Sequence, residues 1–140
     1  MTVQDVLFPV FLQVLLTFVL LFWMGGVRLR ALRRREVRVG DVALGQPAWP
    51  ARALQVGNAF RNQFELPLLF YVAVIVALFT RKADTLFVVL EWLFVLSRLA
   101  HAAIHTTGND LRRRFLAFLA GALILVVMWL LLAARILLAL

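Results

Sequence analysis

An uncharged run of 22 residues, from Val6 to Val27, limits most strongly what this chain can fold into. A helix of that length rises about 33 Å, which is enough to cross the roughly 30 Å hydrocarbon core of a bilayer. A second uncharged run of 20 residues extends from Phe115 to Ala134. A cleaved signal peptide is the alternative for the first run, but arginines follow that run rather than precede it. We therefore expect a membrane protein with spans near both ends of the chain.

Two further spans are predicted in the middle of the chain, where the apolar runs are shorter. Residues 66–80 are uncharged, and residues 85–97 contain Glu91. Either segment could be a buried helix of a soluble protein, or a full span whose polar residues face inward. Composition favours the membrane, because 64% of the residues are hydrophobic, whereas roughly half are in a soluble domain. The sequence predicts one all-α domain over residues 1–140, with four transmembrane helices at about 6–33, 52–80, 84–107 and 110–139.

The connections between these helices differ in length. A short turn is expected at 80–84, and the one long loop at 33–50, which contains two glycines and two prolines. In "TTGND" (106–110) we expect Gly108 to end the third helix and Asn109 or Asp110 to cap the fourth.

Basic residues are concentrated on two of the connections, and the formal net charge is +8. In a soluble protein this charge would suggest binding to nucleic acid. Here the basic residues flank apolar runs, as they do in membrane proteins, where they determine which side of the membrane each loop faces. The positive-inside rule predicts that loops one and three are cytoplasmic and that both termini lie outside, in a multi-pass protein of a bacterial inner membrane. The chain has no cysteine, which excludes disulfides and thiolate chemistry of its own. The bases counted on loops one and three are Arg28, Arg30, Arg33, Arg34, Arg35, Arg38, Arg112, Arg113 and Arg114.

Polar residues form one face on each of the two middle helices. On the second helix four polar residues, from Gln55 to Glu65, are spaced 3, 4 and 3 positions apart, which places them on one side of a helix. Arg61 is four residues before Glu65, so the two side chains could form an ion pair. On the third helix the ionisable residues from Glu91 to His105 are spaced 7, 3 and 4 positions apart, which also places them on one side. Ionisable groups inside a bilayer turn toward the bundle interior and usually mark a function, although small polar side chains also hold helices together. The two faces are Gln55, Asn58, Asn62 and Glu65, and Glu91, Arg98, His101 and His105.

These faces meet arginines of the outer helices at one depth. Arg28 and Arg30 end the first helix, and residues 112–114 begin the fourth. Because arginines outnumber acids there, the predicted site suits an anion with carboxylates, which arginine binds bidentately. The amide side chains suit a ligand with peptide groups. His101 and His105 could form a metal pair, but no third ligand and no "HExxH" motif is present, so no metal is predicted.

Four motifs in order resemble the MAPEG family, the membrane-associated proteins of eicosanoid and glutathione metabolism. They are "VRLR" (27–30), "RNQFE" (61–65) followed by Pro67, "RLAH" (98–101) and "RRR" (112–114). The nearest likeness is to the branch of microsomal prostaglandin E synthase and microsomal glutathione transferase. The pattern covers nearly the whole chain.

The resemblance implies a homotrimer with glutathione bound between adjacent subunits in the cytoplasmic half. It also implies that Arg114 stabilises the glutathione thiolate. Combined with the polar faces, it predicts that glutathione contacts Arg28, Asn58, Arg61, Asn62, Glu65, Arg98, His101 and His105.

The chain departs from the family pattern at three positions. His105 and Phe118 stand where tyrosines are expected, and Phe115 stands where the prostaglandin synthase has a serine. Tyr71, the only tyrosine, is too far along the second helix to replace them. These departures argue against prostaglandin isomerisation.

Three functions compete at this stage. The favoured one is a glutathione-dependent membrane transferase or peroxidase that acts on lipophilic electrophiles through an arginine-stabilised thiolate. The alternative is a non-catalytic MAPEG-like protein that binds a lipid or a partner. A third is a small four-helix exporter with Glu91 as its titratable acid, although Glu91 shares its face with Arg98.

Overall fold

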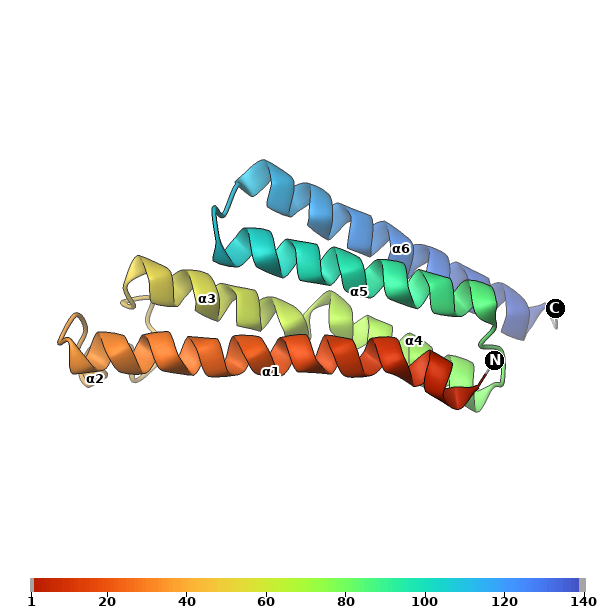
Figure 1. Cartoon of the computed structure of the whole chain (residues 1–140), viewed down its shortest axis with the longest axis horizontal. Helices are drawn as coiled ribbons and strands as arrows, with labels where there is room; N and C mark the ends of the chain where they lie inside the picture. The colour runs from red at the N-terminus through yellow and green to blue at the C-terminus, as the bar shows by residue number, and fades with distance from the viewer. Residues whose placement is uncertain (1, 139–140) are drawn as a thin grey trace.

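The chain forms a bundle of long helices that run alternately up and down (Figure 1). The structure is a computed structural model, and it describes residues 2–138. Four segments are long and apolar enough to cross a membrane, one of them being 51–79 taken as a single span. The expected all-α fold with four membrane-capable helices is therefore confirmed. Its elements are α1 (Val3–Arg33), α2 (Val39–Val42), α3 (Ala51–Arg61), the 3₁₀ turn η1 (Asn62–Phe64), α4 (Leu66–Phe79), α5 (Thr85–Thr106) and α6 (Leu111–Leu137).

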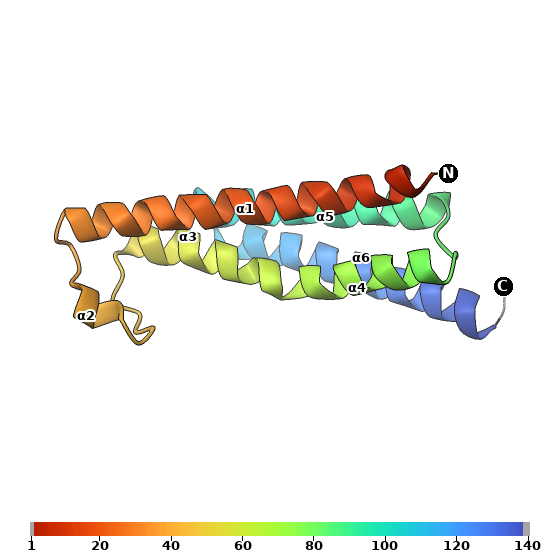
Figure 2. The same ribbon diagram turned by 90° about the horizontal axis from the view of Figure 1, so that it is seen from below.

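The start of α1, the end of α6 and the α4–α5 turn lie at one end of the bundle, which we call the terminal end (Figure 1). The α1–α3 connection and the α5–α6 turn lie at the other end, which we call the loop end. The α1–α3 connection carries the short α2 and projects beside the helices (Figure 2). The two most basic connections thus share one end, and which compartment that end faces stays a prediction.

Side chains cap the start of three long helices. Thr2 and Asp5 form a reciprocal capping box on α1, while Asp84 and Asp110 accept the Phe87 and Arg113 amides, each at 2.9 Å. The α5–α6 turn therefore uses Asp110 as its N-cap, one of the two residues expected there. Gly108 is not in the left-handed region, and Asn109 adopts φ +50° instead.

The second span is not the single helix expected over 52–80. It breaks at η1, and Glu65 has a non-helical backbone with φ −95° and ψ −103°. Pro67 explains the break, because its ring has no N–H for the Gln63 carbonyl and would clash with that carbonyl in a continuous helix. The Gln13 side chain on α1 donates to the Gln63 Oε1 at 2.8 Å, and both side chains are buried. An interhelical hydrogen bond therefore stabilises the bundle at the break.

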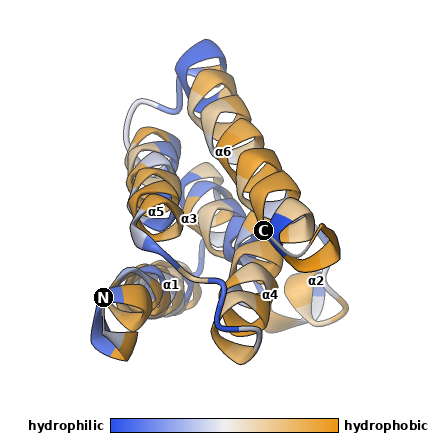
Figure 3. Ribbon diagram, turned by 90° about the vertical axis from the view of Figure 1, so that its right-hand side faces the viewer, coloured by the Kyte–Doolittle hydropathy of each residue, from blue (hydrophilic) through white to orange (hydrophobic). Residues whose placement is uncertain are grey.

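The outer surface of the bundle is apolar, as expected of helices in contact with lipid. The helix bodies are mostly hydrophobic, and hydrophilic residues gather at the connections and helix ends (Figure 3). Phe22 and Leu130, for example, are 74% and 66% exposed.

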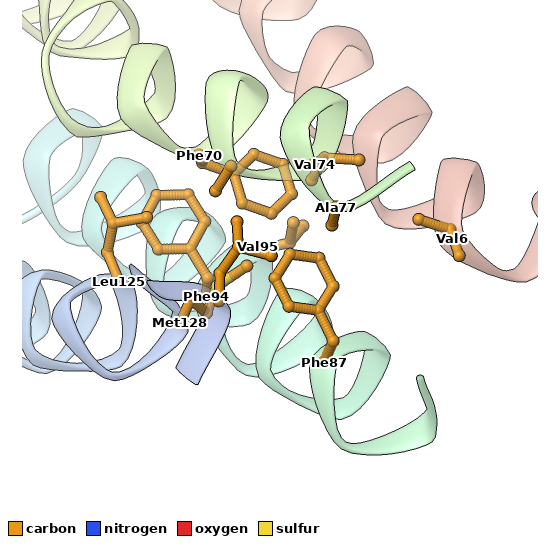
Figure 4. Close-up of a cluster of buried hydrophobic side chains, with 11 residues drawn as sticks. Val6, Phe70, Val74, Ala77, Phe87, Phe94, Val95, Leu125 and Met128 are labelled. Atoms are coloured by element: carbon orange, nitrogen blue, oxygen red, sulfur yellow. The ribbon is translucent and has the colours of Figure 1, made fainter. Parts of the chain in front are cut away.

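The largest hydrophobic core joins α4, α5 and α6 and reaches Val6 on α1 (Figure 4). At its centre Phe70 and Phe94 stack with ring centroids 4.7 Å apart, and neither is exposed. A second cluster contains only Leu20, Ala59 and Ala102 as buried members. Large apolar side chains therefore pack the bundle around α4, and smaller ones pack it around α3.

Candidate functional site

Six of the nine predicted site residues line two separate cavities in the half of the bundle toward the loop end, and Glu65, Arg98 and His105 line neither. Arg28, Asn58 and Arg61 line the first cavity, and Asn62, His101 and Arg114 line the second. Asn62 follows Arg61 directly, so the end of α3 divides the two cavities. One subunit therefore brings the predicted residues together in two groups.

The first cavity, of about 500 Å³, lies between α1, α3 and the long connection. The Arg28 guanidinium stacks over the Trp49 ring at 4.9 Å, so a residue of the connection holds this arginine from one side. On the other side is Gly57, where an added Cβ would lie 3.2 Å from the Arg28 Nη2. The Arg28 Nε is buried and has no hydrogen-bond partner among residues 2–138. The cavity thus presents two arginines and two amides, those of Asn58 and Gln46, and one arginine donor has no partner.

The second cavity, of about 170 Å³, lies between η1, α5 and the start of α6. Arg114 donates to the Asn109 Oδ1 at 2.6 Å, which holds its guanidinium beside the α5–α6 turn. The Asn62 Oδ1 is buried without a partner among the described residues. Phe115 and Phe118 also line this cavity, so its polar groups are an arginine, a histidine and an amide in an apolar setting.

Arg98 lines neither cavity and acts inside the subunit. It is 2% exposed, donates to the Ala117 carbonyl at 3.1 Å, and stacks against Phe118 at 5.4 Å. Its guanidinium crosses α6 at Gly121, where an added Cβ would lie 2.9 Å from the Arg98 Nη2. The same Cβ would lie 2.6 Å from the Ser97 Oγ, so a side chain at position 121 would require both groups to move. Arg98 therefore connects α5 to α6 behind the second cavity.

His105 lies next to His101, with ring centroids 5.6 Å apart, and is also buried. Its Nδ1 has no hydrogen-bond partner among residues 2–138. No group of three or more His, Cys, Asp or Glu side chains that could hold a metal gathers in this part of the chain.

Gln55 is occupied by the end of α5 and lines neither cavity. Its amide donates to the His105 and Thr107 carbonyls at 2.7 and 3.0 Å, and Arg52 donates to the Thr106 carbonyl. The last carbonyls of a helix have no partner within the helix, so these side chains stabilise the α5 terminus.

Glu65 is not where the helical spacing placed it. It is exposed, and within residues 2–138 it forms an ion pair with neither Arg61 nor Arg98. The i,i+4 relation between Arg61 and Glu65 needs a continuous helix, and η1 interrupts it. The single polar face predicted on the second helix is therefore wrong beyond Asn62.

Sequence reasoning missed the contributions of Gln13, Gln63 and Trp49. Gln13 is one of two polar residues, with Thr17, in the run from Val6 to Val27, and an amide within a span is a signal for an interhelical bond. Trp49 carried no such signal, because its contact with Arg28 depends on how the connection folds back.

Comparison with known proteins gives a family. A model described as the MAPEG family matches residues 6–134 of the 140-residue chain. Neither the curated proteins nor the solved structures contain a match.

Proposed function

The chain belongs to the MAPEG family, and on that premise we propose that it is a glutathione-dependent membrane transferase or peroxidase acting on lipophilic electrophiles. The family contains both glutathione transferases or peroxidases and members that catalyse nothing. The choice between them therefore depends on the cavities of this chain.

The observation that carries the proposal is the set of polar groups that stay unused within the subunit. Arg61 and Arg114 have no acidic partner among residues 2–138, and one buried polar atom in each cavity, the Arg28 Nε and the Asn62 Oδ1, has no hydrogen bond there. Buried polar groups in proteins are nearly always hydrogen-bonded, so unused ones suggest a ligand. Glutathione has two carboxylates and two amides, which match arginines and asparagines. The residues of the two cavities therefore fit this molecule.

The division of the site into two cavities supports the homotrimer that the family suggests. The first cavity offers Arg28, Asn58 and Arg61, and the second offers Asn62, His101 and Arg114. We propose that one cavity of a subunit and the other cavity of its neighbour form one complete site. A native mass spectrum in mild detergent should then show trimers, and a spectrum of monomers alone would contradict this assembly.

Bound glutathione supplies a thiol, which is the nucleophile of the proposed reaction. Arg114 lies in the smaller cavity among Phe115 and Phe118, where low polarity strengthens its attraction for negative charge. It also lies in the first turn of α6, whose positive helix end adds to that field. A thiol beside these groups loses its proton more easily, so its pKa falls and the thiolate is favoured at neutral pH. Arg114 is therefore the proposed catalytic residue.

An apolar cavity of about 420 Å³ supports a lipophilic second substrate. It lies between α1 and α4 near the break in the second span, and its lining includes Phe18, Phe60, Phe64 and Tyr71. A compound dissolved in the bilayer has access to such a surface.

The non-catalytic alternative rests on the aromatic residues around Arg114. Phe115 and Phe118 offer no hydroxyl to the second cavity, so Arg114 and His101 are its ionisable groups. The exporter hypothesis has less support, because Glu91 is fully buried and lines neither the two polar cavities nor the apolar one.

A glutathione titration that follows thiolate absorbance separates the first two functions. Wild-type protein should show a thiolate signal below pH 8. Arg61→Ala and Asn62→Ala should weaken binding about ten-fold or more, since a charge-assisted contact contributes roughly 1.5–3 kcal/mol. Arg114→Ala should raise the pKa of the bound thiol and lower turnover, with a smaller loss of affinity than Arg61→Ala.

Arg112→Ala is the matched control, because Arg112 is exposed in the same turn of α6 and lines neither cavity. It should leave both the thiolate signal and the affinity unchanged. A wild-type protein that binds glutathione without any thiolate signal below pH 8 would reject catalysis and favour the lipid-binding alternative.

A further inference from the structure

A third cationic cavity lies at the loop end, where α1 ends and α3 begins. It measures about 160 Å³, and its charged lining residues are Arg30, Arg34, Arg52 and Glu36. It shares no lining residue with either cavity of the proposed glutathione site. A role for it must therefore be sought separately.

The turn after α1 brings the charges of this cavity together. Arg35 adopts φ +57°, and the Glu36 amide donates to the Ala31 carbonyl at 3.0 Å while the Arg35 amide donates to the Leu32 carbonyl at 3.1 Å. This is a Schellman motif, which reverses the chain directly after the helix. It places Glu36 beside Arg34, where the two charged groups are 4.0 Å apart.

The cavity retains an excess of positive charge. Three guanidiniums face one carboxylate, and the Arg30 guanidinium has neither a hydrogen bond nor an acidic partner among residues 2–138. Arg52 is fixed by its bond to the Thr106 carbonyl and by the Trp23 ring, 5.1 Å from its guanidinium carbon. Pro50, the N-cap of α3, also lines this cavity and provides no capping side chain for the first amides of the helix. The cavity therefore suits a phosphate or carboxylate.

The depth of the cavity in a membrane narrows the choice of anion. Arg30 lies one helical turn beyond the uncharged run that ends at Val27, so it reaches the level of lipid headgroups. Below it on the same face of α1 are Trp23, which is 37% exposed, and Val19, which is 51% exposed. Tryptophan is enriched at the membrane interface. Val19, Trp23, Val27 and Arg30 are spaced 4, 4 and 3 residues apart, so they form a stripe along one side of α1. A headgroup in the cavity would have its acyl chain along this stripe.

We propose that this cavity binds the phosphate of an anionic phospholipid, with an acyl chain along the Val19–Trp23 face of α1. The net positive charge disfavours the ammonium group of a zwitterionic lipid, so the lipid should be one without that group. The site is independent of the proposed glutathione site, and either can fail without the other.

Native mass spectrometry of the purified protein tests the proposal by counting lipids bound during titration. Phosphatidylglycerol should bind more tightly than phosphatidylcholine of the same chain length. Arg30→Gln should weaken phosphatidylglycerol binding about ten-fold, as for the loss of one charge-assisted contact. Arg34→Gln is a second variant with the same expectation.

Arg33→Gln is the matched control, because Arg33 is exposed in the last turn of α1 and does not line the cavity. It removes the same charge and should leave binding unchanged. Equal losses in Arg33→Gln and Arg30→Gln would overturn the proposal, since only the general charge of the loop end would then matter. Equal binding of both lipids, or binding of inorganic phosphate as tight as that of phosphatidylglycerol, would overturn it as well.

Discussion

The two helices of the second span, α3 and α4, pack in different ways. α4 buries Phe70, Val74 and two alanines in the main core, and none of the buried residues of α4 itself is polar. α3 buries small residues, among them Ala53, Gly57 and Ala59, and presents polar side chains to the cavities. Burial of large apolar groups is the main source of stability, while small residues let helices approach and leave room for polar groups. The bundle therefore concentrates its packing around α4 and its candidate chemistry around α3.

The largest expected effect is the loss of an aromatic ring from the α4 core. Phe70→Ala removes a fully buried ring that stacks on Phe94, and it should lower the free energy of unfolding by about 3–5 kcal/mol. The control is Phe79→Ala on the same helix, since Phe79 is 90% exposed. Unfolding in mixed detergent and denaturant measures both. If the two variants are equally destabilised, stability is not concentrated in the α4 core.

The next largest expected effect is on stability at the contact between α5 and α6, which both the α3 region and the α4 region adjoin. Gly121→Ala would place a Cβ 2.6 Å from the Ser97 Oγ and 2.9 Å from the Arg98 Nη2, and should destabilise by about 1–3 kcal/mol through overpacking. Arg98→Met in the same chain should recover part of that loss, because the flexible side chain can move away. A double-mutant cycle on melting temperatures measures the recovery. Strictly additive losses would show that Arg98 does not limit position 121.

A smaller effect compares the turns at the two ends of the bundle. Arg35 and Arg81 adopt φ +57° and +56° directly after α1 and α4, where glycine is usual. Arg35→Gly and Arg81→Gly should each stabilise by up to about 1 kcal/mol, and should do so equally, because the left-handed conformation costs a residue with a Cβ about 1–2 kcal/mol and the backbone entropy of glycine offsets part of that gain. Arg33→Gly, inside α1, should destabilise instead. Thermal unfolding compares the three, and a gain at only one of the two turns would show that the surrounding region determines the effect.

The smallest effect is a pH dependence at the terminal end. Burial opposes ionisation of Asp84, but hydrogen bonds from Arg135 and from the Phe87 amide outweigh it and lower the pKa of this carboxyl. A lowered pKa gives stability above the unfolded value near 4, and that stability is lost as the pH falls through the folded value. The loss should be roughly 0.2–1 kcal/mol, as for a partly exposed pair.

Asp84→Asn isolates this contribution, because asparagine still caps α5 while the charge is removed. Below about pH 4 the wild-type melting temperature should approach that of the variant. A constant difference between the two proteins from pH 6 to pH 3 would contradict the assigned role of the Asp84–Arg135 pair.

The fold followed from the sequence more completely than the site did. The long uncharged runs predicted the membrane-capable helices, since a run such as Val6–Val27 has few other structures open to it. Side-chain chemistry narrowed the cap of α6 to Asn109 or Asp110, and the structure uses Asp110. The break in the second span was missed although Pro67 is present in the sequence. Hydrophobic periodicity describes a whole segment, and it does not change when a single proline lacks the backbone N–H that a continuous helix needs.

The errors in the candidate site come from that same break. Helical spacing placed Asn62 and Glu65 on one face, but the face ends where η1 begins, so Glu65 is exposed. Arg98 was correctly placed inside the bundle, but its partner is a backbone carbonyl of α6, and no sequence pattern marks such an acceptor. Contacts between distant residues depend on the packing of whole helices and could not be read from local spacing.

The break at η1 has a mechanical consequence for the bundle. A continuous helix transmits a tilt along its whole length, whereas two shorter helices that meet at a joint can turn separately. The joint at Asn62–Glu65 lies between the helix beside the cavities and the helix in the main core. The backbone amides of α3 should therefore exchange with solvent deuterium sooner than those of α4, whose packing lies in the main core.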